Sequence, residues 1–197
     1  MRFPAKEDDV KYGITRDEAL ALVRQRLRNP NLVNHCLATE AVMRTLARRF
    51  GADPELWGLT GLLHDLDAET QPDLRTHTLE TAALLEEKGV APEIIDAIRM
   101  HNEEAQGGRR RQEVFHHALA AGETITGLIV ATALVYPDRK LASVQPKSVR
   151  KRFKERQFAA GANREIIAEC EKIGIPLDEF CEICLRAMQE VAGELGL

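Results

Sequence analysis

Aromatic residues are scarce in this chain: they make up 5% of its 197 residues, and there is a single tryptophan. The buried core must therefore consist mostly of leucine, isoleucine, valine and alanine. Basic residues do not dominate either. The chain has 27 lysines and arginines and 31 aspartates and glutamates, which gives a net charge of −4. Dedicated nucleic-acid-binding domains are usually basic, so nucleic acid is not an expected partner.

Long hydrophobic runs are also absent. The longest apolar stretch, residues 127–136, holds about ten residues, whereas a membrane-spanning helix needs about 20. The first thirteen residues are charged and contain Pro4 and Gly13, which is unlike a secretory signal. Four cysteines in a chain of this length do not form a disulfide scaffold. We therefore expect a reduced, cytoplasmic protein that does not bind a membrane.

The remaining composition is ordinary for a soluble globular protein, with 44% hydrophobic and 29% charged residues. The length fits a single domain over residues 1–197. Helix signals dominate, and the period-two alternation that is typical of strands is weak. We predict an all-α fold with eight or more helices.

Capping residues indicate where these helices begin and end. Thr15-Arg16-Asp17-Glu18 resembles a capping box, and Asp53-Pro54 is typical of a helix start. The expected helices cover residues 16–28, 31–50, 54–67, 73–88, 92–101, 112–136, a short basic segment from 146, 163–173 and 177–195. Residues 103–111 are polar and contain Gly107-Gly108, so we expect a loop there. The Ile, Val and Thr content of 112–136 leaves a strand open for part of that segment.

Four of the six histidines fall on or near inward-facing surfaces of different predicted helices; they are His35, His64, His77 and His101. His64 is followed directly by Asp65 in LTGLLHDLD, and Gly61 one turn earlier allows a neighbouring helix to approach closely. A single buried histidine is most often an ordinary core residue. Four of them with an adjacent carboxylate favour a metal centre, because imidazole and carboxylate groups from several helices bind Zn, Fe, Mn or Ni well.

The stretch GLLHDLD resembles the signature of the HD-domain metal-dependent phosphohydrolases. The order His35, His64-Asp65, His77, His101 and then an acidic residue is similar to that of members with the fuller ligand set. The resemblance covers an HD core of about residues 30–136, and the extension 137–197 is similar to the C-terminal part of a bacterial and archaeal HD-hydrolase group. It implies a helical bundle that holds one or two divalent ions among Fe, Mn, Zn, Ni and Mg. The implied ligands are His35, His64, Asp65 and Glu123 for one ion, and His77 and His101 for a second, with Asp65 bridging.

Glu123 departs from the family pattern. The last ligand of the family is usually an aspartate in a stretch like A-D-x-x-T-G, and here AGETITGL places Glu123 at that position. Glutamate is one methylene longer, so either its helix sits further away, or it binds through water, or this ligand is lost. A glutamate on the helix surface is the alternative interpretation.

The reaction that the resemblance implies is hydrolysis of a phosphomonoester or phosphodiester of a small metabolite or nucleotide by a metal-activated water. Asp65 and His64 are the implied catalytic residues, and Asp65 would orient the water. Because ligation requires neutral imidazole, activity is expected to fall below about pH 6. The alternative is a non-catalytic regulatory module that binds a metal or a nucleotide. Whether the protein forms a homo-oligomer is left open.

Two basic clusters are candidates for binding an anionic substrate: Arg109-Arg110-Arg111, and Lys147–Arg156 with Arg164 shortly after it. We expect substrate contacts from Arg109, Arg110, Lys147, Arg150, Lys151 and Arg164, because guanidinium and ammonium groups suit phosphate. A solvated helix face is the alternative for each cluster. Phe153 and Phe158 among the basic residues leave an RNA-associated protein as a third, weaker hypothesis.

Two further motifs have simpler interpretations. His116 and His117 are expected on a helix surface, and an approach to the substrate is the alternative interpretation. Cys181 and Cys184, with Cys170 upstream, have the spacing of a metal site but lack a fourth ligand. These thiols are therefore expected to pack on an apolar helix face.

Overall fold

The computed structural model describes residues 10–197. Its helices are α1 (Arg16–Arg26), α2 (Pro30–Phe50), α3 (Pro54–Leu63), α4 (Leu79–Glu87), α5 (Pro92–His101), α6 (Val114–Leu134), α7 (Pro146–Lys154), α8 (Arg164–Ile167), α9 (Leu177–Glu190) and α10 (Ala192–Leu195). Short 3-10 segments are η2 (Glu103–Gln106), η3 (Leu141–Ser143) and η4 (Ala168–Ile173). No strand occurs within residues 10–197, so the predicted all-α fold is confirmed.

Local capping chemistry sets several helix boundaries as the sequence predicts. The Thr15 side chain accepts a hydrogen bond from the Glu18 backbone, and the Glu18 carboxylate accepts one from the Thr15 backbone, which completes the capping box of α1. Asp53 caps α3 by accepting from the Glu55 amide. The helix predicted over residues 31–50 begins one residue earlier, at Pro30, because proline fits the first helical position. Its N-cap is Asn29.

Other predicted helices are too long. The helix expected over 54–67 ends at Leu63, and the one expected over 73–88 begins only at Leu79. The segment between them forms turns that carry site residues, as described below. Residues 163–173 divide into α8 and η4, and the last predicted helix divides at Val191. The strand left open within 112–136 is wrong, since α6 is helical throughout.

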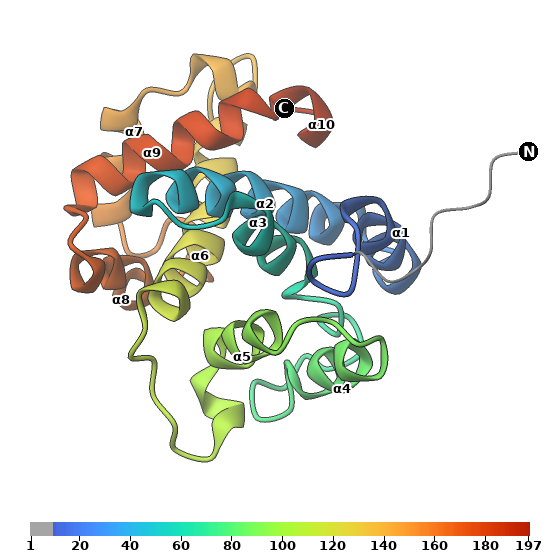
Figure 1. Cartoon of the computed structure of the whole chain (residues 1–197). Coiled ribbons are helices and arrows are strands. Elements are labelled where there is room, and N and C mark those ends of the chain that lie inside the picture. Colours follow the sequence, from blue (N-terminus) through green and yellow to red (C-terminus); the bar gives the residue numbers. More distant parts are fainter. Residues whose placement is uncertain (1–9) are drawn as a thin grey trace, which may run out of the picture.

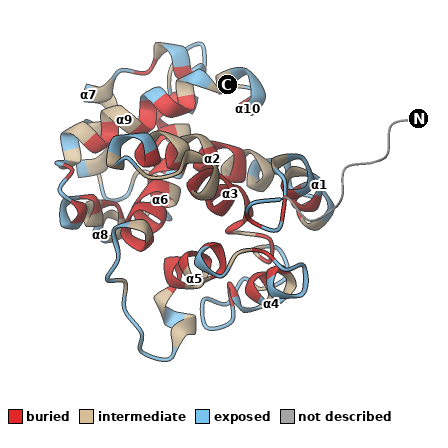
Figure 2. Ribbon diagram, viewed as in Figure 1, coloured by how far each residue is buried: buried red, intermediate tan, exposed pale blue. Residues whose placement is uncertain are grey.

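The helices pack around α2 and α6 (Figure 1). Helix α3 lies along α2, and α9 covers both α2 and α6. Helices α4 and α5 pack against each other and lie on the opposite side of α2 from α7 and α9 (Figure 1). The buried faces of these helices point toward one another and the exposed faces toward solvent (Figure 2). The interior surface between α2, α3, α5 and α6 is where the functional residues gather.

The core is mostly aliphatic, as the low aromatic content predicts. Trp57 stacks on Phe115, with ring centroids 4.8 Å apart, and Phe50 packs against Trp57 at 5.8 Å. All four cysteines are buried free thiols, which confirms that Cys181 and Cys184 pack in the core. Helix α6 is long and apolar enough to cross a membrane, but 67% of its apolar window is buried inside the protein. Its apolar composition is therefore that of a largely buried core helix.

Gly61 sets the distance between α2 and α3. A Cβ atom at this position would lie 2.8 Å from the backbone oxygen of Thr39, a separation that side chains do not tolerate. The absence of a side chain lets the two helices approach until their backbones touch. The predicted close approach beneath the His64-Asp65 pair is therefore confirmed at Gly61, and it brings His64 beside His35 on α2.

Candidate metal centre

All six residues predicted as metal ligands gather in one cluster. His35 lies in the second turn of α2, His64 is the C-cap of α3, Asp65 follows it, His77 precedes α4, His101 ends α5, and Glu123 lies in the middle of α6. His64 is fully buried, and the side chains of the other five are between 6% and 21% exposed. Residues separated by up to 88 positions in the sequence therefore share one small, largely enclosed site.

Asp65 lies at the centre of the cluster. Its Oδ1 is 3.2 Å from His77 Nε2, 3.5 Å from His64 Nε2 and 3.6 Å from His101 Nε2. Its Oδ2 faces the other way and is 3.6 Å from His35 Nε2. A carboxylate with imidazoles on both oxygens has the arrangement of a bridging ligand between two ions.

The ligand atoms form two overlapping groups. His35, His64 and Glu123 offer atoms that lie within 4.8 Å of one another, and so do His64, Asp65 and His101. His35 Nε2 is 3.1 Å from His64 Nε2, and His77 Nε2 is 3.1 Å from His101 Nε2. Glu123 Oε2 is 3.7 Å from His35 Nε2, so its extra methylene does not take it out of reach. Each group could hold a metal ion.

The other ring nitrogen of each ligand-like histidine contacts an oxygen of the protein. The Nδ1 of His64 lies 2.8 Å from the Gly61 carbonyl oxygen, and that of His101 lies 2.6 Å from the Ile98 carbonyl oxygen. Because a carbonyl only accepts, Nδ1 carries the hydrogen and Nε2 keeps its lone pair. Lone pairs from both rings therefore point into the cluster, as metal-ligating histidines require.

Thr126 orients the His35 ring in the same way, through a contact with Nδ1. This role was not predicted from the sequence. Its hydroxyl lies 2.9 Å from His35 Nδ1 and donates to the backbone oxygen of Glu123 at 2.7 Å. With its hydrogen directed to Glu123, the hydroxyl oxygen is free to accept the hydrogen of His35 Nδ1. One turn of α6 thus supplies both a candidate ligand, Glu123, and the residue that orients a second one.

Asp67 is the other supporting residue that the sequence did not reveal. It is fully buried, its Oδ1 is 2.8 Å from His77 Nδ1 in a contact that falls short of hydrogen-bond alignment, and its Oδ2 accepts from the Thr81 amide. Thr78, between His77 and α4, has a φ of +83°, which β-branched residues rarely adopt. The turn that replaces the predicted helix start therefore directs His77 toward Asp65.

Replacing Asp67 by asparagine is expected to lower metal affinity by about 10- to 100-fold, the usual effect of removing a carboxylate behind a histidine ligand. The neutral amide no longer supports the basicity of His77. Titration calorimetry with Mn²⁺ measures the change. Asp73→Asn is the matched control, because Asp73 lies in the same segment but pairs with the exposed Arg75. Equal affinities for the two variants would contradict a supporting role for Asp67.

Burial and charge shift the pKa values of the cluster in different directions. Burial lowers the pKa of His64 to about 3 and raises that of Glu123 to about 8. Burial also opposes ionisation of Asp65, but the surrounding imidazoles hold its pKa well below the ordinary value. For His77, burial is outweighed by Asp65 and Asp67, which raise its pKa to about 10. The site therefore concentrates negative charge on Asp65 and Asp67, beside neutral imidazole at His64.

The donor set fits a divalent ion. Imidazole nitrogens and carboxylate oxygens are the ligands that Zn, Fe, Mn and Ni accept. Nitrogen pairs 3.1 Å apart repel one another unless a proton or a cation lies between them. The buried imidazoles direct their Nδ1 hydrogens away from the cluster, and the central carboxylate is ionised. Both features are required of such a site.

Two cavities open beside this cluster. One, of about 580 Å³, is lined by His35 and Glu123 and by the loop Ala159–Asn163 that follows α7. The other, of about 510 Å³, is lined by His35 and the C-terminal segment of the described chain. Both also include Gly127.

The six basic residues expected to bind substrate do not lie with the ligand cluster. Within residues 10–197, none of them lines either cavity at His35. Arg109 pairs with Asp96 at 2.8 Å, Arg110 with Glu103 at 2.9 Å, and Arg150 with Asp178 at 3.4 Å. Lys147 and Lys151 are exposed on α7. Their role in binding a substrate stays a prediction.

The Arg164 side chain is hydrogen-bonded to the backbone of the protein. It donates to the backbone oxygens of Arg152, Phe153, Glu155, Phe158, Ala159 and Ala162. These bonds fix the loop that forms one wall of the larger cavity. Arg164 is therefore placed to shape the cavity from behind, and a direct contact with substrate stays a prediction for it.

The expectation that His116 and His117 lie on a helix surface is wrong. They are 5% and 7% exposed. His117 Nδ1 is 2.6 Å from Glu169, and His116 Nε2 is 3.2 Å from Asp96. Segment η4 packs against α6 and covers this face of the helix. The local sequence around the two histidines does not reveal that contact.

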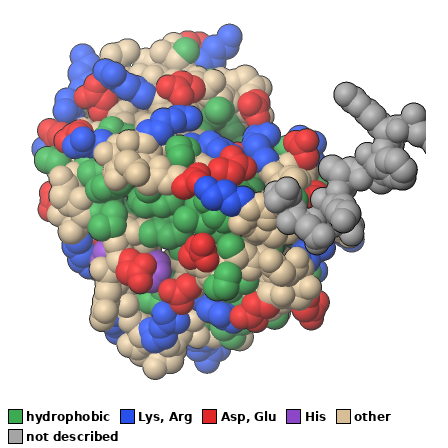
Figure 3. Space-filling model, viewed as in Figure 1, with side chains coloured by type: hydrophobic (Ala, Val, Ile, Leu, Met, Phe, Trp, Pro, Cys, Tyr) green, Lys and Arg blue, Asp and Glu red, His purple; other side chains and the backbone are tan. Residues whose placement is uncertain are grey.

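On the face shown in Figure 3, basic and acidic side chains are interspersed rather than gathered into a continuous basic surface. Histidine atoms are visible there beside acidic side chains. This distribution is not that of a surface that tracks a nucleic-acid backbone.

Comparison with known protein families matches residues 32–134 to the HD domain. The matched segment runs from just before His35 to the end of α6 and so contains all six candidate ligands. No curated protein and no solved structure gives a match. The match covers more than half of the chain, and its limits coincide with the helices that build the cluster. The chain therefore belongs to the HD-domain superfamily of metal-dependent phosphohydrolases.

Proposed function

We propose that this protein hydrolyses a phosphate ester of a small metabolite or nucleotide. The observation that carries the proposal is the convergence of four imidazoles on the two oxygens of Asp65, in a buried site that opens into two cavities. A structural core histidine needs one hydrogen-bond partner, whereas these rings direct their second nitrogens toward a common centre. Such an arrangement is costly unless it serves a ligand.

His35, His64, Asp65 and Glu123 would hold one divalent ion, and His77 and His101 a second, with Asp65 between them. Ions bound there supply charge neutralisation for the phosphate and a water of lowered pKa. Asp65 stays ionised across the neutral range, so one of its oxygens can orient that water. Burial raises the pKa of Glu123 to about 8 in the metal-free site, so its carboxyl group would lose a proton when it binds an ion.

Removal and restoration of metal tests this proposal. The purified chain is treated with a chelator, and hydrolysis is measured on a panel of esters. Free phosphate is the product measured for phosphomonoesters, the monoester product is measured for phosphodiesters, and the linear dinucleotide is measured for cyclic dinucleotides. Turnover is expected to disappear on chelation and to return with Mn²⁺, Fe²⁺, Ni²⁺ or Zn²⁺. The metal content of the protein before chelation shows which ions it carries.

Two outcomes would contradict the proposal. Turnover that survives complete metal removal would exclude a metal-activated water. Stoichiometric metal binding with no hydrolysis of any ester would favour the non-catalytic regulatory module instead.

A further inference from the structure

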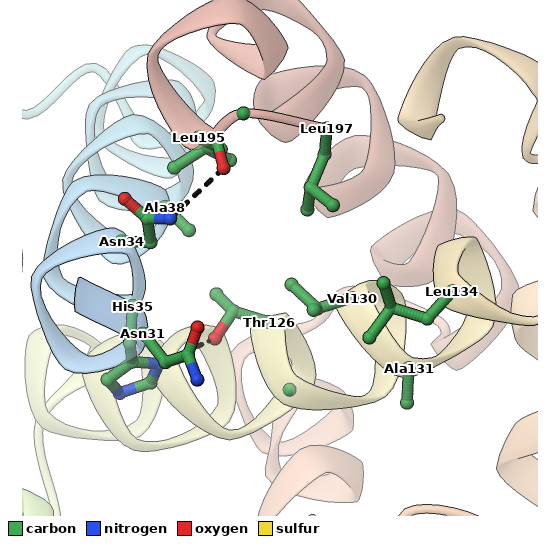
Figure 4. A pocket seen from close by; sticks show the side chains of 12 residues that line it. Asn31, Asn34, His35, Ala38, Thr126, Val130, Ala131, Leu134, Leu195 and Leu197 are labelled. Carbon is green, nitrogen blue, oxygen red and sulfur yellow. Dashed lines mark hydrogen bonds between the residues drawn. The ribbon is translucent and has the colours of Figure 1, made fainter. Parts of the chain in front are cut away.

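The smaller of the two cavities at His35 has no basic side chain in the walls that residues 10–197 form, which is unusual next to a site that binds phosphate. It lies between α2, α6 and the C-terminal segment, and Figure 4 shows Val130, Leu134, Leu195 and Leu197 around it. Of the twelve residues of the described chain that line it, none is Lys, Arg, Asp or Glu. A second phosphate or another charged group would therefore meet no side chain of opposite fixed charge on these walls.

The polar side chains of this cavity are few and partly occupied. The Asn34 amide donates to the backbone oxygen of Leu195 at 3.0 Å (Figure 4). The Thr126 hydroxyl is held between His35 and the Glu123 backbone. A sugar that entered would find few side-chain partners besides the Asn31 amide, and each hydroxyl group left unpaired is unfavourable. An apolar group would lose nothing by leaving water.

The cavity meets the ligand cluster at His35, the one candidate ligand that lines it. His35 and Gly127 line both this cavity and the larger one that contains Glu123. A molecule whose phosphate lies at His35 therefore has its organic part directed toward one of the two cavities. An organic group in the apolar cavity would therefore lie next to a phosphate bound at His35.

Gly127 lies at the junction. It is exposed in the middle of α6, and a Cβ atom built on it would meet nothing within 4 Å. Packing therefore does not require a glycine here, and helix propensity disfavours one. The missing side chain leaves open space at the position where the linings of the two cavities meet.

We propose that the substrate is a phosphate monoester of an uncharged, mainly apolar alcohol, whose organic group lies in the cavity between α2, α6 and the C-terminal segment. This inference rests on the proposed function, since it places the phosphate at the candidate metal centre. It distinguishes alkyl and aryl phosphates from sugar phosphates and polyphosphates.

Binding of n-alkyl phosphonates to the metal-loaded protein tests the proposal without turnover. These probes keep the anionic head group but are not hydrolysed. From butyl to octyl phosphonate, Kd is expected to fall about three- to fourfold for each methylene that the cavity buries. The phosphonate analogue of glucose 6-phosphate, which is also not hydrolysed, serves as the polar comparison and is expected to bind more weakly than octyl phosphonate.

Leu134→Glu and Val114→Glu form a matched pair of variants. Both residues are exposed apolar side chains on α6, 49% and 44% exposed, but only Leu134 lines the cavity. The chain-length dependence of Kd is expected to disappear in Leu134→Glu and to persist in Val114→Glu. Gly127→Leu is expected to weaken octyl phosphonate more than butyl phosphonate, with no loss of thermal stability, because leucine favours the helix.

The outcomes separate this inference from the proposed function. Ester hydrolysis without chain-length dependence of phosphonate binding would overturn the inference and leave the proposed function intact. Chain-length-dependent binding without hydrolysis of any ester would support the cavity and contradict the proposed function. Equal effects of Leu134→Glu and Val114→Glu would show that the cavity is not the binding site.

Discussion

Replacing Asp65 by asparagine is expected to reduce phosphoester hydrolysis by about a thousandfold or more. Asparagine keeps the size of the side chain but removes the negative charge that four imidazoles surround. Loss of a central ligand removes several kcal/mol of transition-state stabilisation, and each 1.36 kcal/mol corresponds to about tenfold in rate. Steady-state kinetics at saturating metal, together with the metal content of the purified variant, measure the effect.

The same substitution also changes the electrostatics of the cluster. Without Asp65, His77 keeps only Asp67 as an anionic partner, so its pKa is expected to fall from about 10 toward the ordinary value. Asp73→Asn again serves as the control, since that carboxylate lies at the surface beside Arg75. Unchanged turnover in Asp65→Asn, with the variant shown to be folded by circular dichroism, would rule out the mechanism.

Helix boundaries could be predicted where the signal is local. Helix α5 begins at Pro92 and ends at His101 as predicted, and the capping box of α1 is formed as its sequence indicates. The boundaries on either side of His77 could not be predicted, because tertiary contacts determine them. Asn102 donates to the backbone oxygen of His77 at 3.0 Å, and Asp67 accepts from the Thr81 amide. These long-range bonds stabilise turns in a segment whose composition is compatible with helix.

The candidate ligands could be predicted because their order along the chain resembles a known family, and because buried histidines are conspicuous. The residues that orient them were not predictable in the same way. Asp67 is one of many acidic residues, and only the fold shows that it is fully buried behind His77. Thr126 is likewise an ordinary helix residue until α2 brings His35 against it. Supporting residues have no spacing rule, since they depend on the packing of separate elements.

The largest effect on stability is expected at Glu169, in a buried ionic cluster that connects η4 to the helices of the metal centre. Its carboxylate accepts from Arg111 at 2.9 and 3.0 Å and lies 2.6 Å from His117. Arg111 is 5% exposed and donates further to the backbone oxygens of Met100 and His101. The cluster therefore satisfies the last carbonyls of α5 at the position of a candidate ligand.

Replacing Glu169 by alanine is expected to lower the free energy of unfolding by about 3–5 kcal/mol, because the Arg111 charge is then buried without its partner. Glu171→Ala is the matched control: Glu171 lies in the same segment but is exposed, and its removal should change stability by less than about 0.5 kcal/mol. Urea denaturation of both variants measures the difference. A loss below 1 kcal/mol for Glu169→Ala would mean that Glu103, 3.7 Å from Arg111 Nε, takes over as partner.

The pH dependence of stability provides a second measurement of the same cluster. Burial opposes ionisation of Glu169, but Arg111 and His117 outweigh it and lower its pKa to about 2, from an ordinary value of 4.5. A carboxylate with a lowered pKa contributes its stabilisation fully above the unfolded value and loses it as the pH falls toward the folded value. The wild-type protein should therefore lose about 3 kcal/mol of stability from this residue between about pH 5 and pH 2. In Glu169→Ala that part of the acid dependence should be absent, whereas an unchanged acid profile would assign the buried charge of Arg111 to another partner.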